Sequence, residues 1–226
     1  MLYYVREVIY IMLDTSKLMP KVFLWMFVGL FVSFGTGYYV SVHPNMVYNL
    51  FSGYTFLFLF LIELGVAIFF AARIRKMKPM TAIISYLLYS FITGLTLSGI
   101  FLAYSMSSIL TIFGVTSILF MIFAILGYVT KIDLTKFGTY LFMVLLGIII
   151  VTLINLFLNN TMIDLIVSIV GIIIFIGFIA YDVQTVKNNL YEIGEETNLA
   201  VYGAFQLYID FINIFLDLIH LFGDSD

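Results

Sequence analysis

The sequence contains no cysteine, so disulfide bonds are excluded and cysteine usage gives no information on the redox compartment. Charged residues are also scarce, at 10% of the 226 residues, whereas a soluble domain has roughly a quarter. Hydrophobic residues make up 63%, and the mean hydropathy of +1.15 indicates an integral membrane protein. No cluster of basic residues favours binding to nucleic acid.

Seven apolar runs are long enough to cross a bilayer, which takes about 20 helical residues. We therefore expect an all-α integral membrane protein, with a single seven-helix transmembrane domain over 1–226. Residues 1–20 mix apolar and charged side chains, which predicts a short helix on the cytoplasmic membrane interface. Pro20 would then precede the first span. The expected spans are about 22–40, 51–72, 80–103, 108–129, 137–158, 162–184 and 199–222.

The positions of lysine and arginine predict the orientation. They precede the first span or fall in every second connection after it, so all of them would lie on one side. The positive-inside rule makes this side cytoplasmic. We therefore expect a multi-pass protein of the plasma membrane, with its N-terminus inside and its C-terminus outside. The basic residues are Arg6, Lys17, Lys21, Arg73, Arg75, Lys76, Lys78, Lys131, Lys136 and Lys187.

Small residues recur every four positions in the first and third spans. This spacing lets helices approach closely. The alternative is that glycine is simply common in membrane helices. The two sets are Gly29, Ser33 and Gly37, and Ser90, Gly94 and Ser98.

A polar stretch at 187–198 carries Glu192, Glu195 and Glu196. It is typical of a solvated cytoplasmic loop between the sixth and seventh spans. A vestibule that attracts cations is the alternative.

The last span carries a polar stripe. Gln206, Asp210, Asn213 and Asp217 are spaced by four, three and four residues, so they share a helical face roughly 60° wide. A carboxylate in hydrocarbon costs roughly 3 kcal/mol on insertion scales, so this face needs a polar interior. An acid inside the membrane is by default a candidate functional residue.

Asp182, at the cytoplasmic end of the sixth span, is the candidate partner of Asp210. Asp210 lies roughly 16 Å into the seventh span, and a tilt could bring the two acids to similar depth. Two carboxylates in a low dielectric cannot both ionise cheaply, so such a pair would share a proton or hold a hard cation. The alternatives are an interface-exposed Asp182 and a structural hydrogen bond for Asp210.

Three charged residues in or directly after the second span are further candidates for the site. Glu63 is a third acid inside the membrane, in the middle of the second span. Arg73 and Arg75 end that span and could pair with Asp182, although the positive-inside signal alone accounts for either one.

Two further groups lie near span ends. His220 is expected near the outer interface, and Asp164 as a helix N-terminal acid.

Enzyme signatures are weak. The chain has no His-Glu-x-x-His, no Gly-x-Ser-x-Gly and no nucleotide-binding loop. Two membrane aspartates could make an aspartyl protease, but the Gly-x-Gly-Asp context of such enzymes is absent. We expect no catalytic activity and no cofactor.

Four segments resemble the Bax-inhibitor (transmembrane Bax inhibitor motif) family, in its bacterial branch. The third and fourth of them are fairly specific together, and the resemblance covers essentially the whole chain. It implies seven helices, with the last one central and surrounded by the other six. The segments are 93–101 (TGLTLSGIF), 131–138 (KIDLTKFG), 180–184 (AYDVQ) and 208–215 (YIDFINIF).

The resemblance also implies a function. Family members are similar to pH-sensitive calcium leak channels gated by a pair of aspartates, which maps onto Asp182 and Asp210. The family's latch arginine falls in 72–76, so Arg73 and Arg75 are both candidates. Asp217 and His220 depart from the common family pattern, which puts the charge of the outer mouth in doubt.

The hypothesis is a proton-gated leak for calcium, with Asp182 and Asp210 as sensor and as calcium ligands. The path above them would be lined by Gln206, Asn213 and Asp217, with Glu63 as a further ligand. The expected partners are the bilayer, calcium ions, protons and other membrane proteins. A proton-coupled transporter and a non-conducting regulatory protein that binds other membrane proteins are the alternatives.

Overall fold

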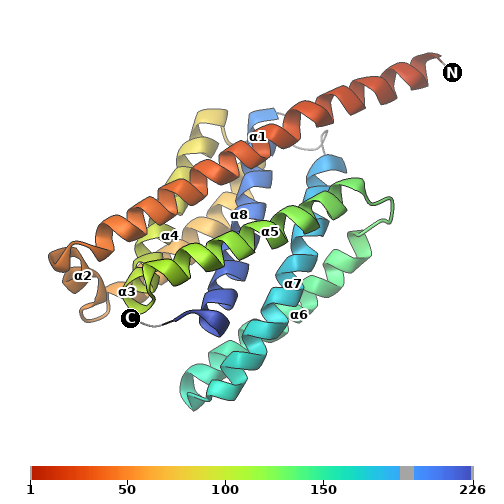
Figure 1. Cartoon of the computed structure of the whole chain (residues 1–226). Coiled ribbons are helices and arrows are strands. Elements are labelled where there is room, and N and C mark those ends of the chain that lie inside the picture. The colour runs from red at the N-terminus through yellow and green to blue at the C-terminus, as the bar shows by residue number, and fades with distance from the viewer. Residues whose placement is uncertain (1, 189–195, 225–226) are drawn as a thin grey trace. The chain divides into compact units, whose positions relative to one another are not determined.

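The computed structural model describes residues 2–188 and 196–224, with side chains described from Lys17 onward except that of Arg75. Within these ranges all the regular elements are helices, as expected, and there is no strand (Figure 1). The elements are α1 (Leu2–Ser41), α2 (Pro44–Phe51), α3 (Thr55–Arg73), the 3-10 helix η1 (Ile74–Lys76), α4 (Pro79–Ala103), α5 (Met106–Val129), α6 (Thr135–Leu158), α7 (Thr161–Asn188) and α8 (Glu196–Phe222).

Seven of the described helices are long and apolar enough to cross a membrane, which confirms the predicted fold class. The second span differs from its expected bounds. Residues 44–51 form the separate helix α2, and the chain turns at Gly53, whose φ of +59° favours glycine. The span itself, α3, therefore begins at Thr55 and not at residue 51.

The expected break at Pro20 is absent. Helix α1 continues through this proline, so its N-terminal part and the first span form one helix. Proline removes one backbone donor, and membrane proteins tolerate this where neighbouring groups satisfy the freed carbonyl. The expected interfacial position of residues 1–20 stays a prediction, because the side chains of 1–16 lie outside the described part.

The helices form two compact units, and α8 contributes to both. Unit one consists of Met1–Leu102 and Lys187–Phe205, and unit two of Ala103–Val186 and Gln206–Asp226. Of the seven spans, α8 has the largest share of buried residues, 72%, whereas in α3 this share is 6%.

In unit one, small residues bring α1 against α4. A Cβ added to Gly94 would lie 2.6 Å from the backbone oxygen of Ser33. The Ser33 hydroxyl donates to the Ser90 carbonyl across the same contact, at 2.7 Å. The predicted role of these small residues in close helix packing is therefore confirmed for Ser33, Ser90 and Gly94.

The first turns of α8 complete unit one. Phe205 packs against Phe70 of α3 and Tyr89 of α4, with ring centroids 4.7 and 5.0 Å apart. At its first residue, Glu196 accepts from the Lys21 ammonium at 2.7 Å, in a half-exposed ion pair. Glu196 thus begins a helix, whereas Glu192 and Glu195 of the expected polar loop lie outside the described residues.

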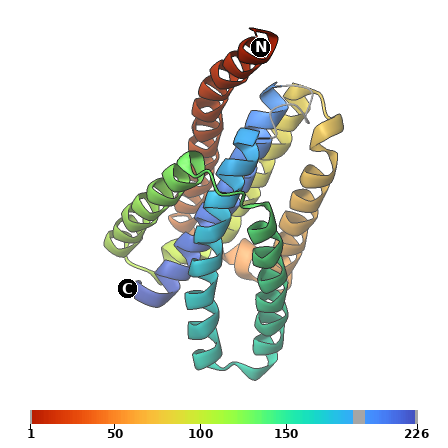
Figure 2. The same ribbon diagram turned by 90° about the vertical axis from the view of Figure 1, so that its right-hand side faces the viewer.

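In unit two, α6 and α7 run side by side and are joined by a short turn (Figure 2). Asn159 makes this turn with a left-handed φ of 48°. Helix α7 also packs closely against glycines of its neighbours: Gly127 of α5 lies against the backbone of Ala180, and Gly138 of α6 against the ring of Tyr181. These contacts fix the part of α7 that carries Asp182.

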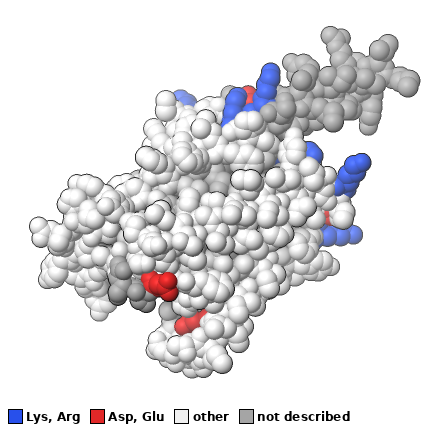
Figure 3. Space-filling view, in the orientation of Figure 1, with Lys and Arg blue, Asp and Glu red and all other residues white. Residues whose placement is uncertain are grey.

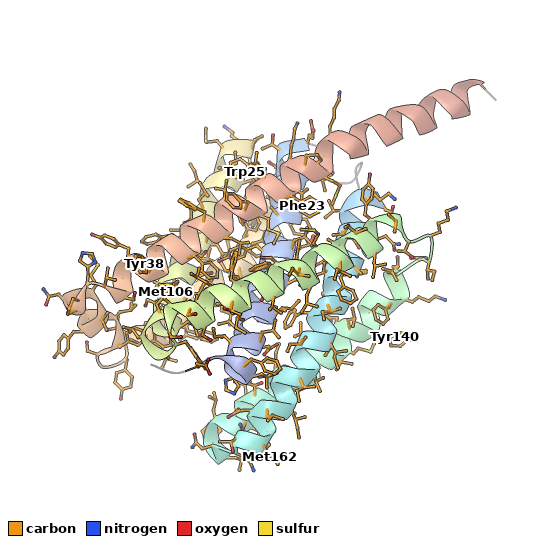
Figure 4. The ribbon with its side chains drawn as sticks, viewed as in Figure 1. Phe23, Trp25, Tyr38, Met106, Tyr140 and Met162 are labelled. Carbon is orange, nitrogen blue, oxygen red and sulfur yellow. The ribbon has the colours of Figure 1, made fainter. Side chains whose placement is uncertain are left out.

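The outer flanks of the helices are apolar. Large side chains remain exposed there, among them Phe31 at 71% and Phe157 at 88%. In Figure 3 most of the visible face carries neither basic nor acidic residues. Figure 4 shows Tyr140 and Met162 on α6 and α7, and they are 65% and 68% exposed. Such a surface suits hydrocarbon lipid chains.

The α1–α4 contact predicts different effects for two glycine substitutions. Gly94→Ala should destabilise the protein by about 1–3 kcal/mol, because the added methyl group meets the backbone of α1. Gly65→Ala is the matched control, since a Cβ at Gly65 has no neighbour within 4 Å. Thermal unfolding in detergent micelles measures both. Equal melting temperatures for the two variants would contradict the proposed close contact.

Candidate functional site

The structure brings Asp182 of α7 and Asp210 of α8 together in unit two. Helix α7 continues to Asn188, four residues past its expected end, so Asp182 lies well inside the helix. The two residues are 5% and 4% exposed. The alternative of an interface-exposed Asp182 is therefore wrong.

The two carboxyl groups lie within hydrogen-bonding reach of each other. A carboxylate has no hydrogen to donate, so a hydrogen bond between them requires a proton on one of the two groups. The structure thus brings the predicted pair together, and the sharing of a proton stays a prediction. Two bare carboxylates at this distance in an apolar interior would repel each other strongly.

Gln206 is the third member of the cluster. It lies one helical turn before Asp210 on α8, and its Nε2 donates to Oδ1 of Asp182 at 3.2 Å. Two oxygens of the cluster have no hydrogen-bond partner among the described residues: Oδ2 of Asp210 and Oε1 of Gln206, both fully buried. The cluster therefore has acceptor capacity that is not used.

Aromatic packing beside Asp210 holds α8 in register with α5. The ring of Phe211 lies between Phe113 and Phe120 of α5, with centroids 5.2 and 5.9 Å apart. Phe211 is 2% exposed. Because adjacent residues of a helix point about 100° apart, fixing Phe211 against α5 also fixes the direction of Asp210.

The outward half of the predicted stripe does not reach the pair. The amide of Asn213 donates to the Ile209 carbonyl of its own helix at 2.8 Å. Asp217 accepts from the Ser168 hydroxyl and lies over Gly171, where a Cβ would overlap its carboxylate. Asp217 thus occupies a second polar site along α7 and α8, separate from the aspartate pair.

Glu63 has its own partners in unit one. Its two carboxylate oxygens accept from Thr93 at 2.7 Å and from Thr96 at 3.0 Å, both on α4. These bonds satisfy the acid where α3 otherwise exposes apolar side chains. Its predicted contribution to the calcium path stays a prediction.

The arginine latch also stays a prediction. Arg73 is the last residue of α3, and its side chain is exposed. Arg75 lies in η1, and its side chain is outside the described part.

His220 and Asp164 lie near the ends of their helices. His220 is exposed in the last turn of α8. Asp164 lies in the first turn of α7, as expected, and accepts from the side-chain amide of Asn155.

Two buried amides to which the sequence analysis assigned no role hold connections between helices of their units. Gln184 of α7 accepts from the Leu134 N–H at 2.8 Å and donates to the Ile132 carbonyl at 2.7 Å. Asn198 of α8 donates to the carbonyls of Ile74 and Met77, at 3.2 and 2.8 Å. The only available signal was their position: each is a polar residue near the end of an apolar run.

The described residues contain no group of three or more histidine and acidic side chains that could hold a metal ion. The predicted calcium ligands are two carboxylates with one amide oxygen nearby. Calcium takes six to eight oxygen ligands, so water or backbone carbonyls would have to supply the rest. The set of donors fits a weakly held, passing ion better than a resident one.

The sequence of this chain can be compared with those of known proteins. A family model described as "Inhibitor of apoptosis-promoting Bax1" matches residues 15–226. The chain belongs to this Bax-inhibitor family. The resemblance carried by the four sequence segments is therefore confirmed.

Several relatives match over most of their length. The inner membrane protein YbhL of Escherichia coli K12 is 38% identical over 212 residues, 91% of each chain. A protein of Borreliella burgdorferi is 38% identical over 213 residues, 92% of each chain. Rickettsia prowazekii RP147 is 34% identical over 213 residues, 92% of this chain and 89% of its own. This Bax-inhibitor family protein is accordingly a multi-pass membrane protein.

The two hydrogen bonds between Gln184 and the α5–α6 connection predict that a substitution of Gln184 destabilises this connection. In Gln184→Leu the α5–α6 connection loses both bonds, so the Leu134 amide should exchange its hydrogen faster. The free energy of unfolding should fall by about 1–3 kcal/mol, because polar groups are left unpaired. Hydrogen exchange read by mass spectrometry tests this, with the α6–α7 turn, which Asn155 holds, as internal control. An unchanged exchange rate of the Leu134 amide would contradict the role of Gln184 in holding this connection.

Proposed function

We propose that this Bax-inhibitor family protein is a pH-gated leak channel for calcium ions, with Asp182 and Asp210 as proton sensor and gate. The observation that carries the proposal is the proximity of their buried carboxyl groups, inside two membrane-spanning helices. Intramembrane acids of this kind mark ion paths and proton relays. The proposal needs no cofactor and no catalytic step.

The shared proton would act as the gate. While it is present, it joins α7 to α8 through the two carboxyl groups. When it leaves, two negative charges stand side by side in a low dielectric, which favours either separation of the helices or entry of a cation. Arg73 or Arg75 would pair with Asp182 in one of the two states. The pH thus sets the balance between closed and open forms.

The ion path would continue along α8. Gln206, Asn213 and Asp217 share one face of this helix, and their oxygens are the kind of ligand that calcium prefers. Glu63 would add a further ligand from α3. In the present structure Asn213 bonds to its own helix and Asp217 to Ser168, so these groups would turn toward the path when it opens.

Calcium flux into liposomes across a pH series tests the gate. Asp182→Asn and Asp210→Asn should each flatten the pH dependence, because an amide cannot gain or lose the shared proton. Asp133→Asn is the matched control. Hydrogen bonds from the hydroxyl and the backbone N–H of Thr135 lower the pKa of Asp133, and this exposed acid lies in the α5–α6 connection, outside the pair.

Other outcomes separate the rival functions. Unchanged flux and unchanged pH response in both variants would remove the sensor role. Saturable transport of a substrate with a fixed number of protons would favour a proton-coupled transporter. No flux from any preparation would favour a regulatory protein that binds other membrane proteins.

We further propose that the N-terminus is cytoplasmic and the C-terminus outside, in the plasma membrane, because the basic residues follow the positive-inside rule. Since the chain has no cysteine, single introduced cysteines report their side without background. Tyr48→Cys, on the exposed α2, should react with an impermeant maleimide in intact spheroplasts. Asp133→Cys should react only after permeabilisation, and the reverse pattern would overturn the orientation.

A further inference from the structure

Five exposed basic residues of unit one, which we call the basic patch, gather at one end of its helices. The positive-inside rule accounts for their side of the membrane, but it does not require them to converge on one place. They come from two stretches of the chain, the first span and the connection between α3 and α4. The five residues are Lys17, Lys21, Arg73, Lys76 and Lys78.

Contacts between α1 and α4 bring these two stretches to the same end. The Tyr86 hydroxyl of α4 donates to the Trp25 carbonyl of α1 at 3.0 Å. Further along both helices, Gly94 lies against the backbone of Ser33. The two helices therefore run in the same direction, and Lys78, two turns before Tyr86, lies at the end of α1 that carries its two exposed lysines.

The first turn of α8 contacts both stretches. Glu196 of this turn pairs with Lys21 of α1 at 2.7 Å. Asn198, two residues later, donates to the carbonyl of Met77 at 2.8 Å, and a lysine stands on either side of Met77 in the sequence. The basic residues of α1 and those of the α3–α4 connection are thus joined through a few residues of one helix.

Positive charge is in excess in the basic patch. The described side chains of unit one include only two acids. Glu63 lies in the middle of α3 and bonds to Thr93 and Thr96 of α4. Glu196 pairs with one of the five basic residues, in a contact that leaves both partners half-exposed. The patch can therefore attract an anion from outside the chain.

Apolar side chains continue from the basic patch along the same helices. Lys17, Lys21 and Trp25 are four residues apart on α1, so they form one stripe that begins basic and ends aromatic. Figure 4 shows Trp25 on this helix. Beside the stripe, Leu24 is 60% exposed, and Met80 at the start of α4 is 67% exposed. A phospholipid has the same order, from charged headgroup to hydrocarbon chains.

From these features we propose that the basic patch binds the phosphate of an anionic phospholipid, whose acyl chains lie along the exposed apolar side chains of α1 and α4. Clusters of roughly four to eight lysine and arginine residues beside a membrane helix attract such lipids. Lysine binds phosphate as a compact charge that donates hydrogen bonds. The bound lipid joins α1 to the α3–α4 connection, and this role does not depend on the proposed channel function.

Trp25 gives a local readout, because it is the only tryptophan of the chain and lies one turn beyond Lys21. Phospholipids with brominated acyl chains quench tryptophan fluorescence on contact. The whole protein is reconstituted in brominated phosphatidylcholine, and unbrominated phosphatidylglycerol or phosphatidylcholine is mixed in. A lipid that binds beside Trp25 displaces the brominated one, so fluorescence returns at a lower fraction of that lipid.

Phosphatidylglycerol should restore the fluorescence with a preference of about tenfold over phosphatidylcholine, because several basic residues contribute to the attraction. In Lys76→Gln/Lys78→Gln this preference should fall at least about threefold. Lys131→Gln/Lys136→Gln is the matched control, since it removes the same charge from exposed lysines of unit two and should keep the preference. Lys17→Gln/Lys78→Gln replaces the first variant if that does not fold, as judged by circular dichroism and size-exclusion chromatography.

Equal restoration by the two lipids would overturn the proposal and favour an acidic segment of a partner protein as the occupant. An equal loss of preference in the patch variant and its matched control would also overturn it, because the attraction would then come from the total charge. Inorganic phosphate, added at constant ionic strength, is the last arm. A preference that survives supports the lipid site, whereas its loss would show that the patch takes free phosphate and that the proposal is wrong.

Discussion

The close approach of two carboxyl groups, buried among apolar helices, is the constraint on which the other features of the site depend. A hydrogen bond between them would require a proton, and it would couple the contact between α7 and α8 to the proton concentration. In water such a bond would contribute little, because each carboxylate would be solvated separately. Inside the bundle neither group can reach water, and losing the proton leaves two charges without screening. This difference turns an ordinary pair of aspartates into a candidate switch.

The rest of unit two makes this contact possible by close packing. Glycines on α5 and α6 let α7 approach until its backbone and the Tyr181 ring touch them. Phe211 fixes the rotation of α8 between two rings of α5. Gln184 ties the α5–α6 connection to α7, two residues beyond Asp182. These contacts hold α7 and α8 in the positions that bring Asp182 and Asp210 together.

The other acids inside the membrane offset the free-energy cost of their burial through different partners. Glu63 is satisfied by two threonine hydroxyls, and Asp217 by a serine hydroxyl above a glycine. Neither has a carboxyl partner among the described residues, whereas Asp182 and Asp210 lie beside each other. The chain belongs to the Bax-inhibitor family and its exposed side chains are largely apolar, so all of these acids belong to one membrane protein. The surroundings of the acids differ because their partners differ.

The sequence by itself determined the class of protein, the seven spans and the family, and it made Asp182 and Asp210 candidate functional residues, because hydropathy and local motifs need no tertiary contacts to be visible. It also placed Gln206 on the same helical face as Asp210, since that follows from helix geometry alone. It missed the separate helix α2 and the continuity of α1 through Pro20, where local signals for turns and breaks are weak. Only the tertiary structure decided that Asp182 is buried, that Gln206 donates to it and that Asp217 turns to Ser168. Each of these depends on which side chain of a neighbouring helix lies opposite, and no spacing within one helix contains that information.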